Sequence, residues 1–256
     1  MNQDFIISEI DDRIGRLILN RPERRNALLP EMMMAAGNNV LELSKSTNVI
    51  LLSATGPVFC SGFDLRVCNE HPSVMYDMLS GLLVFIKALR EVPVPVVCAV
   101  QGAAVAGGCA LLSGCDYVIS HKQARMGYPA LKIGISPAVT AALFRLSVGD
   151  GSARERLLDT RLFSATEALN WGLIHECMDY ADEVLPCAEK VAHEFKIKPP
   201  HSLQTTKEWL NKLDGSLNEE VLNGGLVTSS SLAGDNESRQ RIKAIWNSNP
   251  NRNEPK

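Results

Sequence analysis

Features typical of nucleic-acid-binding and metal-binding proteins are missing from this sequence. Its 256 residues carry 26 Lys and Arg against 29 Asp and Glu, giving a formal net charge of -3, and no block of five or six basic residues occurs. Nucleic acid is bound by clustered positive charge, so this balance argues against nucleic acid as a partner. The five histidines show no ligand spacing, and we therefore expect no metal.

An uninterrupted apolar run long enough to cross a membrane is also absent. The longest apolar stretch, Val92 to Leu112, is broken by Pro93, Pro95 and Gln101. It predicts a buried strand, a turn and a helix instead of a membrane span. The first residues have no basic region followed by an apolar core, and acidic residues among them argue against a transit peptide. We therefore expect a soluble cytoplasmic protein with no membrane partner.

The cysteines do not suggest disulfides or a metal site. They are seven, an odd number, and no C-x-x-C pair occurs among them. Scattered cysteines in an intracellular chain are typical of reduced thiols packed in the core. The positions are Cys60, Cys68, Cys98, Cys109, Cys115, Cys177 and Cys187.

The first half of the chain alternates strand and helix patterns. A hairpin is predicted at 5–19, where two alternating segments flank Asp11-Asp12. Continuous Val, Ile and Leu runs then alternate with segments of helical spacing, which favours parallel strands buried on both faces and right-handed crossovers. Strands are expected at 48–53, 94–100 and 117–120, and helices at 30–43, 74–89 and 107–113.

From Pro137 onwards the pattern is almost wholly helical. Ser164 and Glu167 form a capping box, and Gly172 stands where a helix C-cap is expected. Lys198-Pro199-Pro200 is the best candidate for a domain junction. We therefore divide the chain into a core of residues 1–198 and a helical region of residues 199–256. Further helices are expected at 182–195, 202–213, 217–232 and 237–246.

Two glycine-rich turns each follow a β-branched apolar run and lead towards a helix. The first runs from Gly56 to Leu65 and the second from Gln101 to Cys109. At a strand-to-helix turn the backbone N–H groups are free to donate, and glycine lets an oxygen approach closely. Two such turns facing each other could hold one developing oxyanion.

Ordered motifs run along most of the chain: Asn20-Arg21-Pro22, Asn26-Ala27-Leu28, the first turn, Gln101-Gly102 with Gly107-Gly108-Cys109, Cys115-Asp116, and Ala168-Leu169 with Trp171-Gly172-Leu173. In this order they resemble the enoyl-CoA hydratase/isomerase (crotonase) superfamily. The resemblance implies an α/β fold: a ClpP-like spiral of ββα units with a helical C-terminal trimerisation region. It further implies a homotrimer, or a hexamer built as a dimer of trimers, and an acyl-CoA thioester as substrate. CoA then arrives with the substrate, and no separate cofactor is expected.

The resemblance assigns an oxyanion hole to the two turns. In this family the thioester carbonyl accepts hydrogen bonds from two backbone N–H groups, which here belong to Phe63 and Gly107. The Phe63 ring is expected to narrow or reshape the acyl pocket. Basic residues near the CoA phosphates correspond to Arg25 and Arg66, with Arg24 a weaker candidate. Lys243 could reach a neighbouring subunit's CoA. The expected substrate-binding and CoA-binding residues are Arg25, Ala27, Ser61, Asp64, Arg66 and Ala130.

The departure from the family pattern concerns the proton carriers. Typical hydratases use two glutamates, whose positions here hold Ala110 and Ala130. Other members place an acid about four residues after the position of Gly134, where this chain has Ala138. General acid–base help is worth roughly 10²- to 10⁴-fold per group, so efficient hydration by the standard mechanism is not expected.

Substitute proton carriers are few. Ser136 and Tyr128 are the candidates we retain, although Ser136 precedes a helix start and suits an N-cap, and Tyr128 suits a pocket wall. Asp64 fits a structural or adenine-loop role, and Cys109 a packed thiol without a histidine partner. His121 is expected in an exposed loop, and Glu91 on the surface.

Three functions remain open on these grounds. The first is an acyl-CoA enzyme that stabilises a thioester enolate for isomerisation, decarboxylation or another non-standard reaction. The second is a catalytically silent acyl-CoA-binding protein. The third is an acyl-CoA thioester hydrolase, which would need a nucleophile or a water-activating base that the sequence does not place.

Overall fold

The computed structural model describes residues 4–248, which are built around a six-stranded sheet. Its strand order is β1-β2-β3-β4-β6-β9. The hairpin of β1 (Ile6–Asp11) and β2 (Ile14–Leu19) is antiparallel, and every later pairing in the sheet is parallel. The remaining strands are β3 (Val49–Ala54), β4 (Val96–Ala99), β6 (Tyr117–His121) and β9 (Glu176–Met178).

Strand β3 shows why these apolar runs are continuous. Val49 and Leu51 belong to a core shared with α8 (Val184–Lys196) on one face of the sheet. Ile50 and Leu52 belong to the main core on the other face. Because successive strand side chains point to opposite faces, a strand covered on both sides must be apolar throughout. The predicted burial of both faces is confirmed.

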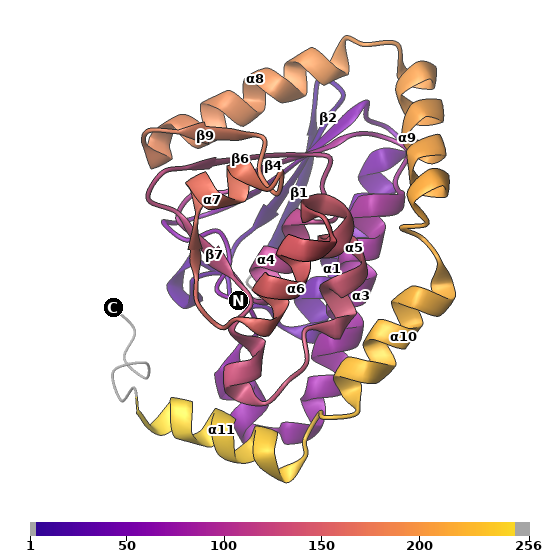
Figure 1. Ribbon diagram of the computed structural model, residues 1–256. Helices are drawn as coiled ribbons and strands as arrows, with labels where there is room; N and C mark the ends of the chain where they lie inside the picture. The colour runs from indigo at the N-terminus through magenta and orange to yellow at the C-terminus, as the bar shows by residue number, and fades with distance from the viewer. Residues whose placement is uncertain (1–3, 249–256) are drawn as a thin grey trace.

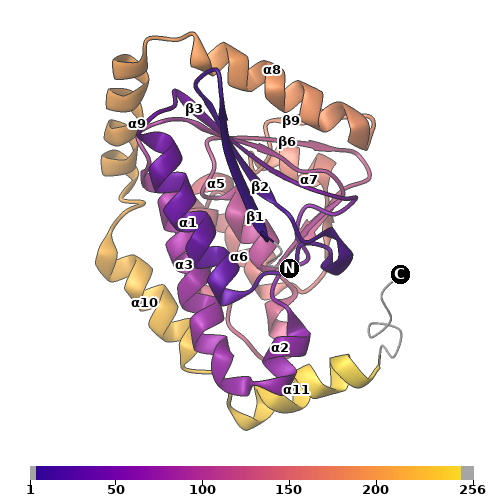
Figure 2. The ribbon, with the colours of Figure 1, turned by 180° about the vertical axis from the view of Figure 1, so that it is seen from behind.

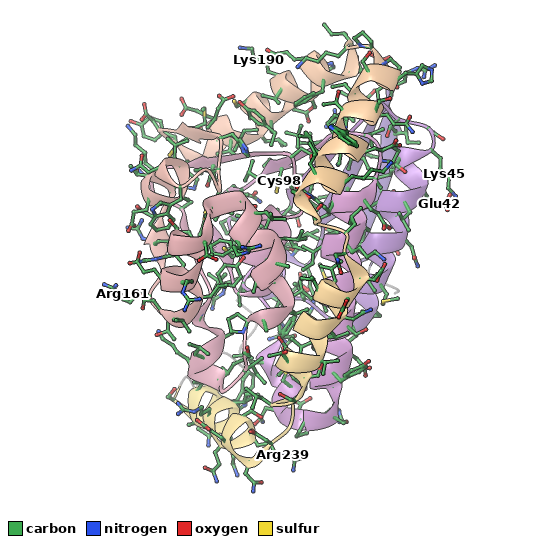
Figure 3. The ribbon with its side chains drawn as sticks, turned by 45° about the vertical axis from the view of Figure 1, so that its right-hand side comes forward. Glu42, Lys45, Cys98, Arg161, Lys190 and Arg239 are labelled. Atoms are coloured by element: carbon green, nitrogen blue, oxygen red, sulfur yellow. The ribbon has the colours of Figure 1, made fainter. Side chains whose placement is uncertain are left out.

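Helices form the layers on the two faces. Helix α8 crosses the outer face, while α1 (Pro30–Ser44) and α3 (Met75–Glu91) pack against each other on the inner side (Figures 1 and 2). Charged side chains such as Glu42, Lys45 and Lys190 lie on the surface, whereas Cys98 lies inside (Figure 3). The other helices of this part are α2 (Leu65–Glu70), α4 (Gly107–Leu112), α5 (Ala138–Val148), α6 (Asp150–Leu158) and α7 (Ala165–Asn170).

A smaller sheet lies beside the main one and has strand order β5-β7-β8. Strands β5 (Ala103–Val105) and β7 (Arg125–Gly127) are parallel, and β8 (Phe163–Ser164) joins β7 antiparallel. Short 3₁₀ segments connect the elements at Pro22–Arg24 (η1), Pro72–Val74 (η2), Pro129–Ile133 (η3) and Ala181–Glu183 (η4).

The last three helices run along one edge of the molecule and around its lower end (Figure 1). They are α9 (Pro200–Asp214), α10 (Glu219–Ser230) and α11 (Asn236–Asn247). Helix α9 is tied to the core by Lys207, which is 6% exposed. Its Nζ donates to Asp116 Oδ2 at 2.6 Å and to the Val94 carbonyl at 3.0 Å.

The prediction that the chain is almost wholly helical from Pro137 onwards is confirmed, and the exceptions that it did not place are β8 and β9. Strand β8 has two residues and β9 has three, too few for any periodicity to be visible. Their extended conformation comes from pairing with β7 and β6, a tertiary effect. The predicted capping box is confirmed: Ser164 accepts from the Glu167 N–H, and the Glu167 carboxylate accepts from the Ser164 N–H.

Among the described residues, one helical segment, Pro72–Glu91, is long and apolar enough to span a membrane. Of its most apolar stretch, 56% is buried inside the protein. It contains α3, whose apolar side chains pack against the main core. Such burial is what a core helix of a globular protein shows.

Candidate active site

The two glycine-rich turns lie side by side, joined by backbone hydrogen bonds. Cys60 donates to the Ala103 carbonyl at 3.0 Å, and Val105 donates to the Cys60 carbonyl at 2.9 Å. The parallel pairing of Cys60 with Ala104 continues this ladder. The predicted meeting of the two turns is therefore confirmed.

Close packing fixes the contact at the tip of the turns. A Cβ on Gly62 would lie 3.0 Å from both the Ala106 Cβ and the Val105 carbonyl oxygen, and 3.6 Å from the Gly107 nitrogen. Gly62 also has φ +90, a conformation that favours glycine. Ala106 has φ 50 and ψ -114, a strained conformation for a residue with a Cβ. The surrounding contacts keep Ala106 in this strained conformation, immediately before Gly107.

The N–H groups of Phe63 and Gly107 make no hydrogen bond to any part of the chain that the structure describes, whereas one chain neighbour of each is paired. Asp64 donates to the Leu28 carbonyl at 3.0 Å, and Ala106 donates to the Gly127 carbonyl at 2.8 Å. Gly107 is the first residue of α4, where a helix leaves its N–H groups without internal partners. Two backbone donors thus remain available at the junction of the turns.

A cavity of about 970 Å³ opens in front of these donors. It is walled by both turns, by η1, α2, α3, η3 and the start of α5, and by the far end of α11. The structure brings together all ten residues that the sequence analysis retained as site residues: Arg25, Ala27, Ser61, Phe63, Asp64, Arg66, Gly107, Tyr128, Ala130 and Ser136.

The Phe63 ring lies against Gly107. Its Cε1 and Cδ1 atoms lie 3.5 and 3.6 Å from the position that a Cβ on Gly107 would occupy. The ring therefore occupies space next to the second donor, where it limits what can accompany a carbonyl oxygen into the site. This agrees with the expectation that Phe63 reshapes the pocket.

Charge along the cavity wall is mostly positive. The lining contains Arg24, Arg25, Arg66 and Lys132 against the acidic Glu23 and Asp64. Asp64 is committed elsewhere: its Oδ2 lies 2.8 Å from an Arg21 nitrogen, and its Oδ1 accepts from the Arg66 N–H at 3.0 Å, capping α2. The structural role expected for Asp64 is confirmed. The cavity retains a surplus of cations suited to phosphate groups.

Neither of the two alanines at the glutamate positions brings a carboxylate, and they differ in their surroundings. Ala130 is half-buried and lines the cavity. Ala110 is fully buried in α4 and is not part of the cavity wall. Ala138 is half-buried at the start of α5. The deep part of the cavity is therefore bounded by apolar side chains and hydroxyl groups.

Ser136 is held at the start of α5. Its Oγ accepts from the Ala138 N–H at 3.3 Å, but the N-cap of α5 is Pro137, so the expected N-cap role of Ser136 is wrong by one residue. Its carbonyl accepts from the Ser229 hydroxyl of α10 at 2.8 Å. Because the Ser136 Oγ is engaged as an acceptor, its proton stays free to donate into the cavity.

Tyr128 is 2% exposed, and its ring packs edge-on against Phe144 with centroids 4.8 Å apart. Its hydroxyl lies near Cys109 and Thr140 without a well-formed hydrogen bond. Burial raises the pKa of Tyr128 well above its usual value, with the neighbouring Cys109 adding to the effect. The phenol therefore stays protonated and can donate a hydrogen bond, but it is a poor base.

Three further sequence expectations have clear outcomes. Cys109 is fully buried, and burial raises the pKa of its thiol to about 12, which confirms a packed thiol. The Glu91 carboxylate is one-third exposed and lies 4.0 Å from Lys87, as a surface group would. The expectation of an exposed loop at His121 is wrong. That residue ends β6, is 4% exposed, and accepts a hydrogen bond from the Gly102 N–H.

Sequence reasoning missed part of the wall. Ile245 and Trp246 of α11 line the same cavity as Phe63, and α11 packs against α2 (Figure 2). Nothing local in the sequence brings residue 246 to the same cavity as residue 63. Arg21 does not line the cavity but pairs with Asp64, which does, and its burial could not be predicted from the sequence.

Residues 9–240 match the family model described as "Enoyl-CoA hydratase/isomerase". This chain belongs to the enoyl-CoA hydratase/isomerase family. "Enoyl-CoA hydratase domain-containing protein 3, mitochondrial" of Danio rerio is 32% identical over 205 residues, covering 76% of this chain and 70% of that protein.

Solved structures give the same result. The enoyl-CoA hydratase/isomerase of Pseudoalteromonas atlantica T6c superposes with a TM-score of 0.83 at 26% identity, covering 95% of this chain and 97% of that one. An enoyl-CoA hydratase/isomerase of Xanthobacter autotrophicus Py2 gives 0.82 at 26% identity, with 97% and 98% covered. The crotonase-type α/β fold with a helical C-terminal region, inferred from the sequence, is confirmed.

Proposed function

We propose that this protein binds an acyl-CoA thioester and stabilises its enolate between the N–H groups of Phe63 and Gly107, in a reaction other than standard hydration. The observation that supports it most directly is the pair of unpaired backbone donors at the wall of a large cavity. Donors of this kind are aimed at charge that develops on the carbonyl oxygen, and losing one costs roughly 10²- to 10³-fold in rate.

The reaction class follows from which groups could move a proton. Isomerisation requires a base to remove a proton next to the thioester. Tyr128 is a poor base, and the Asp64 carboxylate is paired with Arg21. Decarboxylation breaks a carbon–carbon bond, and its electron pair flows into the enolate oxygen without any base. The Ser136 hydroxyl could then return a proton to carbon, whereas the Tyr128 hydroxyl is buried beside Cys109 and is the weaker candidate. Decarboxylation therefore fits the site better than isomerisation does.

A catalytically silent acyl-CoA-binding protein is the alternative. The burial of Ala110 behind the cavity wall favours it, because no space remains for a second proton carrier there. The cations of the wall would bind CoA equally well in a silent protein. No separate cofactor enters either proposal.

Self-association into a trimer or a hexamer is part of the proposal. Several large apolar side chains of the C-terminal helices are more than half exposed, which is unusual for a surface without a partner. They are Trp209, Leu210, Leu213, Val221 and Val227. Sedimentation of the purified protein would measure the oligomeric state directly.

The experiment that tests the function is calorimetric titration with acetyl-CoA, crotonyl-CoA, malonyl-CoA and free CoA, followed by mass spectrometry of the same mixtures. Conversion of malonyl-CoA to acetyl-CoA would support decarboxylation. Binding without conversion across a broad acyl panel would favour the silent protein. Absence of binding would overturn the acyl-CoA assignment.

Two variants test whether the Gly107 N–H takes part in any turnover. Gly107→Pro removes the N–H at the first position of a helix, and because proline also disfavours the φ 50, ψ -114 conformation of the preceding Ala106, urea unfolding first establishes that this variant folds. Gly107→Ala adds the same Cβ near Leu28 but keeps the donor, so it is the matched control. Turnover should fall by roughly 10²-fold or more in the proline variant relative to the alanine variant. Equal turnover of the two would remove Gly107 from the mechanism.

A further inference from the structure

His121 lies outside the cavity wall, yet it is bonded to the turn that carries Gly107. It is the last residue of β6 and is 4% exposed. Its Nε2 accepts from the Gly102 N–H at 2.9 Å. The backbone of His121 is itself fixed, because it is paired with Met178 of β9 and its carbonyl accepts from the Ala124 N–H. The backbone that carries the imidazole is therefore fixed in position.

Gly102 lies at the start of the second turn, where that turn packs closely against the first. It has φ +72, and a Cβ there would overlap the carbonyl oxygen of Pro57. The preceding Gln101 side chain donates to the carbonyls of Ala54 and Gly56, at 2.6 and 3.1 Å. The start of the second turn is therefore fixed on two sides. The Gln101 side chain bonds it to the first turn, and the His121 imidazole bonds it to β6.

Strand β5 directly follows Gly102 and leads to Gly107. Its register against the first turn is set by the bonds that join Cys60 to Ala103 and Val105. Without the imidazole the partly buried Gly102 N–H would lose its acceptor, since no other bond to it exists among residues 4–248. A partly buried donor that loses its partner must find another acceptor or reach water, so the start of the second turn would shift.

We propose that His121 is a positioning residue for the oxyanion hole: it holds Gly102 and so sets where the Gly107 N–H lies relative to the Phe63 N–H. The catalytic part of this inference rests on the function proposed above. A displacement on the order of 1 Å can cost up to ~10²-fold in rate, because the donors must meet the oxygen in the transition state. Binding of the CoA moiety depends on the cations and is not affected by such a shift.

The chain offers a matched control for this bond. His175 Nδ1 accepts from the Val118 N–H at 3.0 Å, the same kind of bond to the neighbouring backbone. It lies at the side of the sheet where Tyr117 stacks on it, and it does not line the cavity. Loss of either histidine removes one bond between an imidazole and a backbone N–H, but only His121 holds the second turn.

The experiment compares His121→Met, His121→Gln and His175→Met. Methionine has the length of glutamine without a strong acceptor, so the first two variants differ mainly in the hydrogen bond. Amide exchange by NMR is read at Cys60, Val105 and Ala106, whose N–H groups bond within and beside the second turn. Where the protein turns over a substrate, kcat and KM are measured on the same samples.

We expect His121→Met to speed exchange of those three amides by ~10-fold or more and to lower kcat by at least ~10-fold, with acyl-CoA affinity retained. His121→Gln should restore both, and His175→Met should change neither. Unchanged exchange in His121→Met, or an identical pattern in His175→Met, would overturn the proposal. Exchange decides the positioning role even if no substrate is converted, a result that would count against the proposed function alone.

Discussion

A Cβ on Gly108 would lie 2.5 Å from the carbonyl oxygen of Cys60 and 2.7 Å from its Cβ. The first turn of α4 therefore rests directly on the first glycine-rich turn, backbone against backbone. Because that oxygen also accepts from the Val105 N–H, it cannot retreat without breaking the ladder between the two turns. The separation of the two donor N–H groups depends on this contact.

Gly108→Ala should for this reason be strongly destabilising. Forcing a methyl group into a close-packed site typically costs about 1–3 kcal/mol, and here the obstructing atoms are backbone. Gly224→Ala in α10 is the control, since nothing lies within 4 Å of its added Cβ. That variant should gain about 0.5–1 kcal/mol from helix propensity. Urea unfolding gives both values, and equal stability of the two variants would contradict the packing described here.

The two alanines at the family's glutamate positions should respond differently to glutamate. Ala130→Glu places its carboxylate in the cavity and should change the free energy of unfolding by less than about 1 kcal/mol, as exposed substitutions do. Ala110→Glu must bury a charge in α4, so we expect a loss of about 3 kcal/mol or more. Urea unfolding of each single variant measures the difference. Ready tolerance of Ala110→Glu would show that the cavity can extend to this position.

The partly buried pair of Lys207 and Asp116 should contribute more than a surface pair. The Lys207 ammonium is bonded to the Asp116 carboxylate and to two backbone carbonyls, and its side chain is 8% exposed. In Lys207→Met the Asp116 carboxylate, which is 24% exposed, keeps only its bond from the Val96 N–H, and we expect a loss of about 1.5–3 kcal/mol. Lys45→Met breaks an exposed pair with Glu42 and should cost less than about 1 kcal/mol. Similar losses in the two variants would mean that α9 contributes little to the stability of the core.

Local chemistry explains how much of this fold the sequence predicts. The run Val49-Ile50-Leu51-Leu52 predicts a doubly covered strand because no other environment accepts four successive apolar side chains so well. The capping box of Ser164 and Glu167 can likewise be predicted from the sequence, since its two hydrogen bonds lie within four residues. The Gly107 donor could be placed because it opens a helix, whereas Phe63 precedes the N-cap of α2 and is assigned through the family resemblance.

What could not be predicted depends on contacts between distant segments. Strand β9 is extended because β6 lies beside it, and its three residues carry no pattern of their own. His121 has a polar side chain after a strand, which usually means a loop; its burial follows from the second turn folding back over β6. The same holds for Trp246, whose place at the cavity depends on the path of α9, α10 and α11.

Thiol labelling tests the burial of the cysteines and its effect on their ionisation. Five of the seven thiols are buried, and only Cys177 and Cys187 are partly exposed. Burial raises the pKa of Cys60, Cys68 and Cys109 to about 12 because a thiolate is poorly solvated inside the protein. The thiolate is the reactive form, so these three groups should remain unmodified in the folded protein even when the pH is raised from 7 to 10.

At pH 8 we therefore expect a chromogenic disulfide reagent to modify at most two thiols in the folded protein and all seven in 6 M guanidinium. Even the two accessible groups should react slowly, since burial and the nearby Glu176 raise the pKa of Cys187 to about 11. Raising the pH to 10 should speed those two and leave the other five dependent on unfolding. Mass spectrometry of digested samples identifies the modified positions. Rapid labelling of Cys109 at pH 8 would contradict its packing behind the cavity wall and would restore it as a candidate nucleophile.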